Sequence, residues 1–210
     1  RNILHMLGQF VETAQKAKVP NFLVVAIDQQ TSDFLNKRGV ANYVRPLRTR
    51  SGSTDNHATS GLKFQILSEL LSVGVSVLLT DVDVVLTQDP FPALYRDSDV
   101  EGMSDGWDED SGYGFIYEVP LLLATPGGGA GGAAAAANAP IRSVRMAARN
   151  SGLFFLSATH EAKRLMEILA KRMASEDVWD QSAYNQEVFR PAYAHYVSPG
   201  VSHRAMNFLC

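Results

Sequence analysis

An apolar run that ends in two aspartates, residues 75–83 (VSVLLTDVD), constrains the fold more than any other feature of the chain. A run of this length is typical of a buried central strand, and the end of such a strand is where open α/β sheets bind ligands. Asp81 and Asp83 are separated by one residue, so two negative charges are expected close together there. Such a pair needs a divalent metal, a basic partner or a raised pKa. Hard carboxylate oxygens favour Mg²⁺ or Mn²⁺ over zinc.

The composition is that of a globular domain with a substantial core. The chain has 210 residues, of which 46% are hydrophobic and 20% are charged. A formal net charge of -3 gives no general reason to expect binding to nucleic acid or to an anionic membrane. We therefore predict no nucleic-acid partner. The only cysteine is Cys210, which excludes a fold held together by internal disulfides.

The two ends of the chain indicate a domain of a longer protein. The sequence opens without methionine inside a helical pattern, and it closes as an apolar run begins. We interpret residues 1–210 as one domain truncated at both ends. No stretch reaches the roughly 18 apolar residues of a membrane span, and the start lacks a signal-peptide pattern. Residues 125–140 (TPGGGAGGAAAAANAP) are of low complexity and predict an insertion on the surface.

Helical and strand patterns alternate along the chain, which predicts an α/β fold with a mainly parallel sheet. Helices are expected at about residues 3–18, 31–38, 60–73, after Thr159 and around Asn185, and strands at 22–27, 41–44, 75–80, 100–104, 150–156 and 193–197. Gly74 has the position of a residue that ends a helix. Thr159 has the position of an N-cap.

Several landmarks occur in the order typical of one enzyme family. They are residues 21–28 (NFLVVAID), 56–63 (NHATSGLK), 80–85 (TDVDVV), 89–91 (DPF), 104–105 (SD), 150–155 (NSGLFF) and 179–181 (WDQ) with Asn185. With these landmarks the chain resembles nucleotide-diphospho-sugar glycosyltransferases of the GT-A fold. It is most similar to family 77 of plant and algal arabinosyl- and xylosyltransferases. The resemblance covers nearly the whole chain apart from the Gly/Ala insertion, and it implies a Rossmann-like, mixed and mainly parallel sheet with helices on both faces.

The resemblance also implies a chemistry for the aspartate pair. Asp81 and Asp83 would hold Mn²⁺ or Mg²⁺ against the two phosphates of a UDP-sugar, where the metal stabilises the charge that develops on the departing UDP. The implied reaction is retaining transfer of arabinose or xylose to a hydroxyl of a glycoprotein or cell-wall glycan. The implied compartment is the Golgi lumen, with a type II membrane anchor outside this chain. The structural alternative is that one aspartate caps the following turn.

Three polar residues are candidates for binding the donor. Lys63 is expected in the first turn of its helix, where the helix dipole disfavours a cation unless an anion lies nearby; the alternative is a lysine that snorkels along the surface. His57, in the polar loop before that helix, is a candidate donor to the nucleotide or an exposed residue without a role. Asn150, next to an apolar strand, either presents its amide to the donor sugar or occupies an ordinary turn.

Three further residues are candidates for contacting the reacting sugars. Asp105 follows the strand expected at 100–104, and the resemblance implies that this region touches the donor sugar. Trp107 beside it either stacks on a sugar or has a packing role. Asp180 and Gln181 belong to the landmark that implies recognition of sugar hydroxyls, although an aspartate at a helix start is commonly a cap. Spacing identifies no nucleophile, so double displacement and front-side transfer both remain open.

Two other classes of function are compatible with the same residues. Residues 78–84 (LLTDVDV) fit the strand signature of haloacid-dehalogenase-type phosphatases, in which Asp81 would be the nucleophile and Asp83 the acid/base. Those enzymes carry it on their first strand, whereas residues 1–74 precede it here. The other class is a glycosyltransferase-like module that binds or assembles without turnover. His195 and His203 are available as a third metal ligand, but neither lies in a pattern that identifies one.

Overall fold

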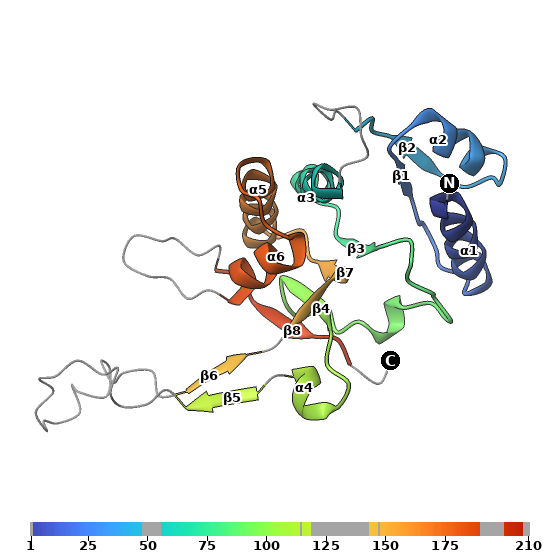
Figure 1. Ribbon diagram of the computed structural model, residues 1–210. Helices are drawn as coiled ribbons and strands as arrows, with labels where there is room; N and C mark the ends of the chain where they lie inside the picture. The colour runs from blue at the N-terminus through green and yellow to red at the C-terminus, as the bar shows by residue number, and fades with distance from the viewer. Residues whose placement is uncertain are drawn as a thin grey trace, which may run out of the picture.

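The computed structural model describes residues 2–47, 56–113, 115–118, 143–146, 148–189 and 200–207. Its central element is a four-stranded sheet, and the strands follow one another in the order β3 (Val77–Thr80), β7 (Arg149–Leu156), β4 (Val100–Ser104) and β8 (His203–Ala205) (Figure 1). Strand β7 is antiparallel to β3 and β4, whereas β4 and β8 are parallel. Three of the four strands therefore run in one direction, which confirms the predicted mixed, mainly parallel α/β sheet.

The strand register brings the ends of β3 and β4 to the same edge of the sheet. Thr80, the last residue of β3, pairs with Leu153 of β7. Ser104, the last residue of β4, pairs with Arg149 at the beginning of β7. The aspartates that follow β3 and β4 therefore emerge on either side of the first residues of β7, at one edge of the sheet.

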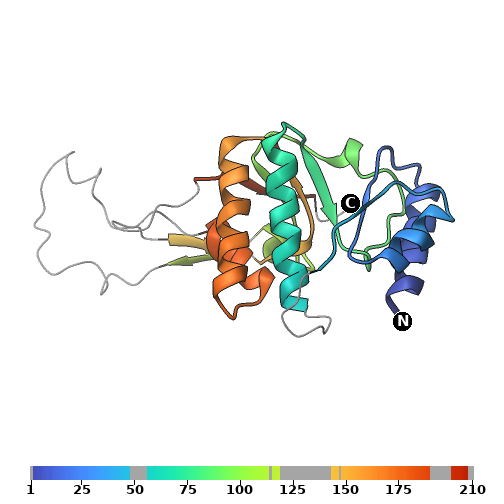
Figure 2. The ribbon, with the colours of Figure 1, turned by 90° about the horizontal axis from the view of Figure 1, so that it is seen from above.

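Helices α3 (Asn56–Ser72), α5 (His160–Ser175) and α6 (Asp180–Phe189) pack together over the sheet, with α3 and α5 side by side (Figure 2). The core contains Phe64, Leu67, Val100, Phe154, Leu156, Leu165, Met166, Leu169 and Tyr184. The rings of Phe154 and Tyr184 stack with centroids 5.0 Å apart, which fastens α6 to β7. As predicted, Thr159 caps α5, and its hydroxyl accepts the Ala162 N–H at 3.2 Å.

The 3-10 helix η1 (Phe91–Ala93) leads into a segment that bonds to Glu101 of β4. Side chains alternate along β4, so Glu101 points away from the face that carries the buried Val100. The fully buried Glu101 carboxylate accepts the backbone N–H groups of Tyr95 and Arg96, each at 3.0 Å. These bonds satisfy a charge that would otherwise be costly to bury.

A second, smaller α/β unit lies beside β3 (Figure 1). It contains α1 (Asn2–Lys16), β1 (Val24–Ala26), α2 (Gln29–Asn36) and β2 (Asn42–Val44), and β1 and β2 are parallel. Its core includes Phe10, Val11, Ala26 and Leu35. Val82 and Leu86, which follow β3, pack against that core. Apolar contacts therefore hold the segment that carries the aspartate pair against this unit.

The structure differs from the sequence-based expectations in several elements. Helix α3 begins at Asn56, one turn earlier than predicted. Elements α4 (Glu109–Tyr113), β5 (Phe115–Glu118), β6 (Ser143–Met146) and β8 were not predicted. Gly74 follows α3 with a φ of 80°, in agreement with its predicted role at the end of that helix. The strand expected at 193–197 and the insertion at 125–140 lie outside the described residues.

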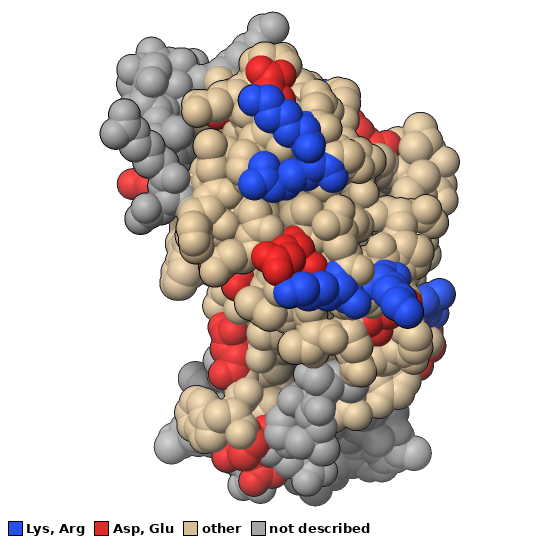
Figure 3. Space-filling model, turned by 90° about the vertical axis from the view of Figure 1, so that its right-hand side faces the viewer, with Lys and Arg blue, Asp and Glu red and all other residues tan. Residues whose placement is uncertain are grey.

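The lengths of the helices and the charges on the surface concern two expected classes of partner, membranes and nucleic acid. Over the described residues, every helix is too short or too polar to cross a bilayer. On the face that carries the smaller unit, Lys and Arg side chains lie among Asp and Glu side chains (Figure 3). Among the described residues of this face, basic and acidic side chains are therefore interspersed.

Candidate active site

The end of β3 lies unusually close to β7 at Gly152. The Asp81 N–H donates to the Gly152 carbonyl at 2.7 Å. A Cβ added at Gly152 would lie 2.9 Å from Asp81 Oδ2 and 3.0 Å from Asn150 Oδ1. Side chains essentially never pack this closely, so glycine is what allows the carboxylate and the amide to lie against the strand. The Asn150 Oδ1 atom also accepts the Gly152 N–H at 2.7 Å, which fixes the amide there.

Asp81 is in an environment that favours a bound cation. Burial raises the pKa of Asp81, the Lys63 ammonium opposes that rise, and the negative charges of Asp83 and Asp180 add to it. Asp83 is exposed, whereas Asp81 is only partly so. Burial is thus the largest cost to the ionised form of Asp81, Asp83 and Asp180 add to that cost, and a bound cation would offset it.

The two carboxylates fit a hard divalent ion but do not enclose one. Among the described residues, no three His, Cys, Asp or Glu side chains are grouped as a metal centre. Mg²⁺-like ions are commonly held by one or two carboxylates together with substrate phosphates and water. His203 does not complete the site, since it pairs with Val100 at the other end of β4 and its ring packs 4.8 Å from that of Phe189. His195 lies outside the described residues.

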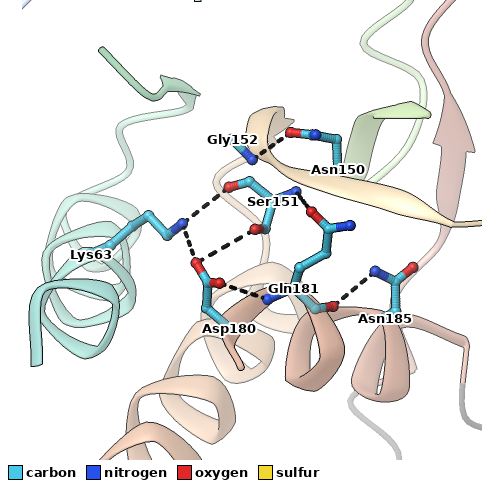
Figure 4. Close-up of polar contacts among 7 residues, drawn as sticks. All are labelled: Lys63, Asn150, Ser151, Gly152, Asp180, Gln181 and Asn185. Atoms are coloured by element: carbon cyan, nitrogen blue, oxygen red, sulfur yellow. Dashed lines mark hydrogen bonds and ion pairs between the residues drawn. The ribbon is translucent and has the colours of Figure 1, made fainter. Parts of the chain in front are cut away.

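Lys63 is held inside the site by two acceptors. Its ammonium donates to Asp180 Oδ2 at 2.8 Å and to the Ser151 carbonyl at 3.1 Å (Figure 4). The side chains of Lys63 and Asp180 are each 12% exposed, so the alternative of a snorkelling surface lysine is wrong. Lys63 also lies two turns into α3, because the helix begins at Asn56. A dipole argument limited to the first turn therefore does not apply to it.

His57 lies in the first turn of α3 rather than in a preceding loop. The expectation of a loop position was wrong because the helix starts a turn earlier. The side chain of His57 lies outside the described residues, so its expected contact with the nucleotide stays a prediction.

Asp180 is the first residue of α6 and serves the site through Lys63. Burial on its own raises the pKa of Asp180, but the hydrogen bond and charge of Lys63 outweigh that effect, with help from the Gln181 N–H and the Ser60 hydroxyl. The net result is a lowered pKa. Asp180 Oδ1 accepts the N–H of the next residue, Gln181, at 2.9 Å. This is not the bond of an ordinary N-cap, which reaches two or three residues further along the helix.

Asp105 is oriented by two amide groups from different elements. Gln181 Nε2 donates to Asp105 Oδ2 at 2.7 Å, and Asn150 Nδ2 donates to Oδ1 at 2.8 Å. Asp105 itself is exposed. An ionised carboxylate has about four acceptor positions, and these two bonds leave capacity for hydroxyl groups of a ligand. The structure therefore joins the predicted residues Asp105, Asn150 and Gln181 in one network.

The sequence did not reveal every residue on which this network depends. Asn185 accepts the Arg149 N–H at 2.8 Å and donates to the carbonyls of Arg149 and Gln181, each at 2.8 Å. It thereby fastens the start of β7 to α6. The family landmarks include Asn185 but predict no role for it, although its spacing of four from Gln181 puts both on one helix face. The roles of Ser151 and Gly152 depend on contacts distant in sequence, and no local signal indicates them.

Residues 17–209 match the profile of the family described as nucleotide-diphospho-sugar transferase. Arabinosyltransferase RRA2 of Arabidopsis thaliana is 35% identical over 214 residues, which cover 98% of this chain and 46% of that protein. Arabinosyltransferase RRA1 of the same plant is 32% identical over 212 residues, or 98% of this chain and 50% of that protein. The chain thus spans about half the length of these two relatives.

A more distant relative is the beta-arabinofuranosyltransferase RAY1 of Arabidopsis thaliana. It is 26% identical over 187 residues, which cover 85% of this chain and 30% of that protein. The family match favours the glycosyltransferase interpretation over the phosphatase one, since it extends across almost the whole chain and not only across the strand with the aspartates.

Proposed function

The chain belongs to the nucleotide-diphospho-sugar transferase family, and we propose that it transfers a pentose, arabinose in the first place, from a UDP-sugar to a hydroxyl of a glycoprotein or cell-wall glycan. The choice of arabinose is supported by the two relatives that are at least 32% identical and are named arabinosyltransferases. The observation that carries the proposal is the aspartate pair at the end of β3, where the partly buried Asp81 lies against Gly152 and Asp83 is exposed.

In this proposal Asp81 and Asp83 hold Mn²⁺ or Mg²⁺. When bound, the ion supplies Lewis-acid stabilisation of the negative charge that develops on the departing UDP. The protein's part is to present two carboxylates from a fixed backbone. The bond from the Asp81 N–H to Gly152 and the close approach at that glycine support this role.

Asp105, Asn150 and Gln181 are proposed to bind sugar hydroxyls. Asp105 is exposed, and its oxygens are each oriented by an amide, so the carboxylate can accept hydroxyl groups without reorganising. Lys63 and Asp180 neutralise each other. We assign them to positioning, since they fix α3, β7 and α6 relative to one another. Lys63 in addition places a positive charge near Asp81.

Retention of the anomeric configuration is proposed because the resemblance to glycosyltransferase family 77 implies it. The reaction then follows either double displacement or front-side transfer. Asp105 is the carboxylate of the proposed sugar-binding network. A double displacement would require such a carboxylate to be free to attack the anomeric carbon of the donor sugar. Both of its oxygens already accept an N–H, which holds it still but lowers its nucleophilicity and so favours the front-side route.

The proposed setting is the Golgi lumen, with a type II membrane anchor outside this chain. The setting is compatible with a cell-wall or glycoprotein acceptor. Microscopy of the full-length protein carrying a fluorescent tag tests it directly: a reticular or cytosolic distribution would argue against this setting.

A transfer assay tests the reaction. The protein is incubated with UDP-arabinose or UDP-xylose, an arabinosylated glycopeptide acceptor, and either Mn²⁺ or EDTA, and both released UDP and glycosylated product are measured. We expect product with UDP-arabinose and Mn²⁺, and none with EDTA. Metal-dependent UDP binding without product would instead identify a non-catalytic binding module. Product that is insensitive to EDTA would contradict the metal role.

A further inference from the structure

Both tryptophans of this chain are exposed to an unusual degree. The sequence contains two, Trp107 and Trp179, and their exposed fractions are 83% and 70%. Tryptophan is highly buried on average because its ring is large and apolar. Here the core is filled by other aromatic residues, with Phe64, Phe154 and Tyr184 fully buried. The two indoles contribute little to that core, so their exposure calls for another explanation.

The two tryptophans flank one hydrogen-bonded pair. Trp107 follows Asp105 by two residues, Trp179 precedes Gln181 by two, and Gln181 Nε2 donates to Asp105 Oδ2 at 2.7 Å. A separation of two residues limits the distance between Cα atoms to about 7 Å. Both tryptophans therefore lie close to the same carboxylate–amide pair, although they are far apart in sequence.

The backbone at each tryptophan is anchored while the ring is exposed. The Trp107 N–H donates to Ser111 Oγ at 3.1 Å. The Trp179 carbonyl accepts the Ala183 N–H of α6 at 2.9 Å. The rings are thus carried on fixed backbone, which lowers the entropy cost of holding a ligand between them.

This combination has the chemistry of a carbohydrate site. A sugar ring has an apolar face of C–H groups, which packs on an aromatic ring, and a rim of hydroxyls, which need acceptors and donors. Asp105 and Gln181 supply a carboxylate and an amide, each two residues from one of the tryptophans. Small-molecule sites commonly combine aromatic walls with a few placed polar groups in this way.

The position of the pair relative to Asp81 favours the acceptor over the donor diphosphate. Asp81 follows β3 and Asp105 follows β4, and β7 lies between these two strands. Adjacent strands are about 4.8 Å apart, so two steps across the sheet amount to about 10 Å. A diphosphate held at Asp81 and Asp83 therefore leaves Asp105 to the sugars. Asn150 lies between Asp81 and Asp105, on the side of the donor sugar, and Gln181 bonds the other oxygen of Asp105, on the side left for the acceptor.

We propose that Trp107 and Trp179 form a stacking platform for the glycan part of the acceptor, with Asp105 and Gln181 binding its hydroxyls between them. The proposal rests on the proposed function, since it identifies the second substrate of that reaction. It adds a binding site for a short oligosaccharide, distinct from the aspartate pair that serves the donor.

The indole emission of the protein gives a direct test, because every tryptophan signal comes from these two residues. The wild type and the variants Trp107→Phe and Trp179→Phe are titrated with arabinotriose and, separately, cellotriose. We expect a saturable change in emission with at least one of them, visible from each indole in the single-tryptophan variants. No change with either sugar would overturn the proposal.

Affinities of alanine variants complete the test. Trp107→Ala and Trp179→Ala are expected to weaken binding of the same trisaccharide at least tenfold, measured by ligand-observed NMR. Val73→Ala, which removes an exposed apolar side chain next to the end of α3, is expected to leave the affinity unchanged. Equal binding by wild type and the tryptophan variants would contradict the platform. Binding of hexaproline in place of the sugars would instead make these residues a peptide-docking surface.

Calorimetry with UDP and Mn²⁺ on the same proteins separates this proposal from the proposed function. We expect the tryptophan variants to bind UDP as the wild type does, because the platform lies away from the aspartates. If the wild type fails to bind UDP, the proposed donor site fails, whereas the trisaccharide titration still decides the platform. If the alanine variants lose UDP binding as well, the two tryptophans support the whole site and the platform proposal is overturned.

Discussion

Lys63 and Asp180 are nearly buried at the centre of the site, and each supplies the other's opposite charge at 2.8 Å. This one contact both joins elements of the fold and neutralises two charges. It joins α3 to the first residue of α6, and the same ammonium bonds a carbonyl of β7. A buried ion pair is costly to break from one side, because the remaining charge is left without compensation.

Lys63→Met is therefore expected to lower the free energy of unfolding by about 3–5 kcal/mol at neutral pH. The pKa of Asp180 is lowered in the folded wild type, so the stability from this pair is present above the unfolded pKa of aspartate and is lost as the pH falls through the folded value. In the variant, burial without Lys63 favours the protonated carboxyl. The difference between the two proteins should shrink between pH 7 and about pH 4.

Urea unfolding at both pH values measures this difference. Lys163→Met is a matched control, since Lys163 lies on the surface of α5 at 3.7 Å from Glu167 and exposed pairs contribute about 0–1 kcal/mol. A loss of stability for Lys63→Met that is the same at both pH values would contradict the role given to Asp180.

Gly152→Ala is expected to damage the aspartate site while leaving the fold in place. The added Cβ would lie 2.9 Å from Asp81 Oδ2, so the carboxylate must turn away from its present position. We expect binding of UDP in the presence of Mn²⁺ to weaken at least tenfold, as measured by calorimetry.

Gly8→Ala serves as the comparison for Gly152→Ala. A Cβ at Gly8 of α1 would meet Phe34 Cζ at 3.5 Å, an ordinary contact, and alanine is the better helix former by about 1 kcal/mol. This variant should bind UDP normally and be at least as stable as the wild type. Unchanged UDP binding by Gly152→Ala would show that the close approach has no functional importance.

At the scale of elements, the position of α6 decides where Asp180 and Gln181 lie. Arg172 of α5 donates to Glu187 Oε1 of α6 at 2.7 Å and to Gln186 Oε1 at 2.7 Å. The Glu187 side chain is 1% exposed. These bonds hold the C-terminal part of α6 against α5, while Asn185 holds it to β7.

Arg172→Met is expected to destabilise the protein by about 3 kcal/mol or more, because it removes the guanidinium from a buried carboxylate. Lys171→Met, one residue earlier and exposed, is expected to change stability by less than about 0.5 kcal/mol. Thermal unfolding followed by circular dichroism compares the two variants. Equal midpoints would mean that α6 is held in place without this ion pair.

Local patterns predicted most elements, but not those whose existence depends on distant partners. The buried positions Leu165, Met166 and Leu169 follow helical spacing, so α5 could be predicted from periodicity alone. Strand β8 covers three residues, His203–Ala205, which is too short for a periodic pattern. It is a strand because β4 offers it an edge. The early start of α3 was missed because residues 49–59 are rich in Ser, Thr, Gly and Asn, which are typical of loops.

At the scale of the whole molecule, the sheet order assembles the site. Asp81 could be singled out from the sequence because an apolar strand leads directly into it. Its neighbours could not, since Asp105 meets Gln181 across 76 residues and Lys63 meets Asp180 across 117. The strand order places β7 between β3 and β4, and the packing of α3 and α6 brings Lys63 to Asp180. No local pattern specifies which strands and helices become neighbours.

Asp81 and Asp83 are proposed to bind a divalent cation together with the diphosphate of the donor. Calorimetric titration of UDP tests this binding most directly, with the wild type, Asp81→Asn and Asp83→Asn each measured in Mn²⁺ and in EDTA. Asp33→Asn, on the exposed surface of α2, controls for the loss of one charge. We expect UDP binding that needs Mn²⁺, survives in Asp33→Asn and falls at least tenfold in Asp81→Asn and Asp83→Asn. UDP binding that is equal in EDTA, or equal in all four proteins, would contradict it.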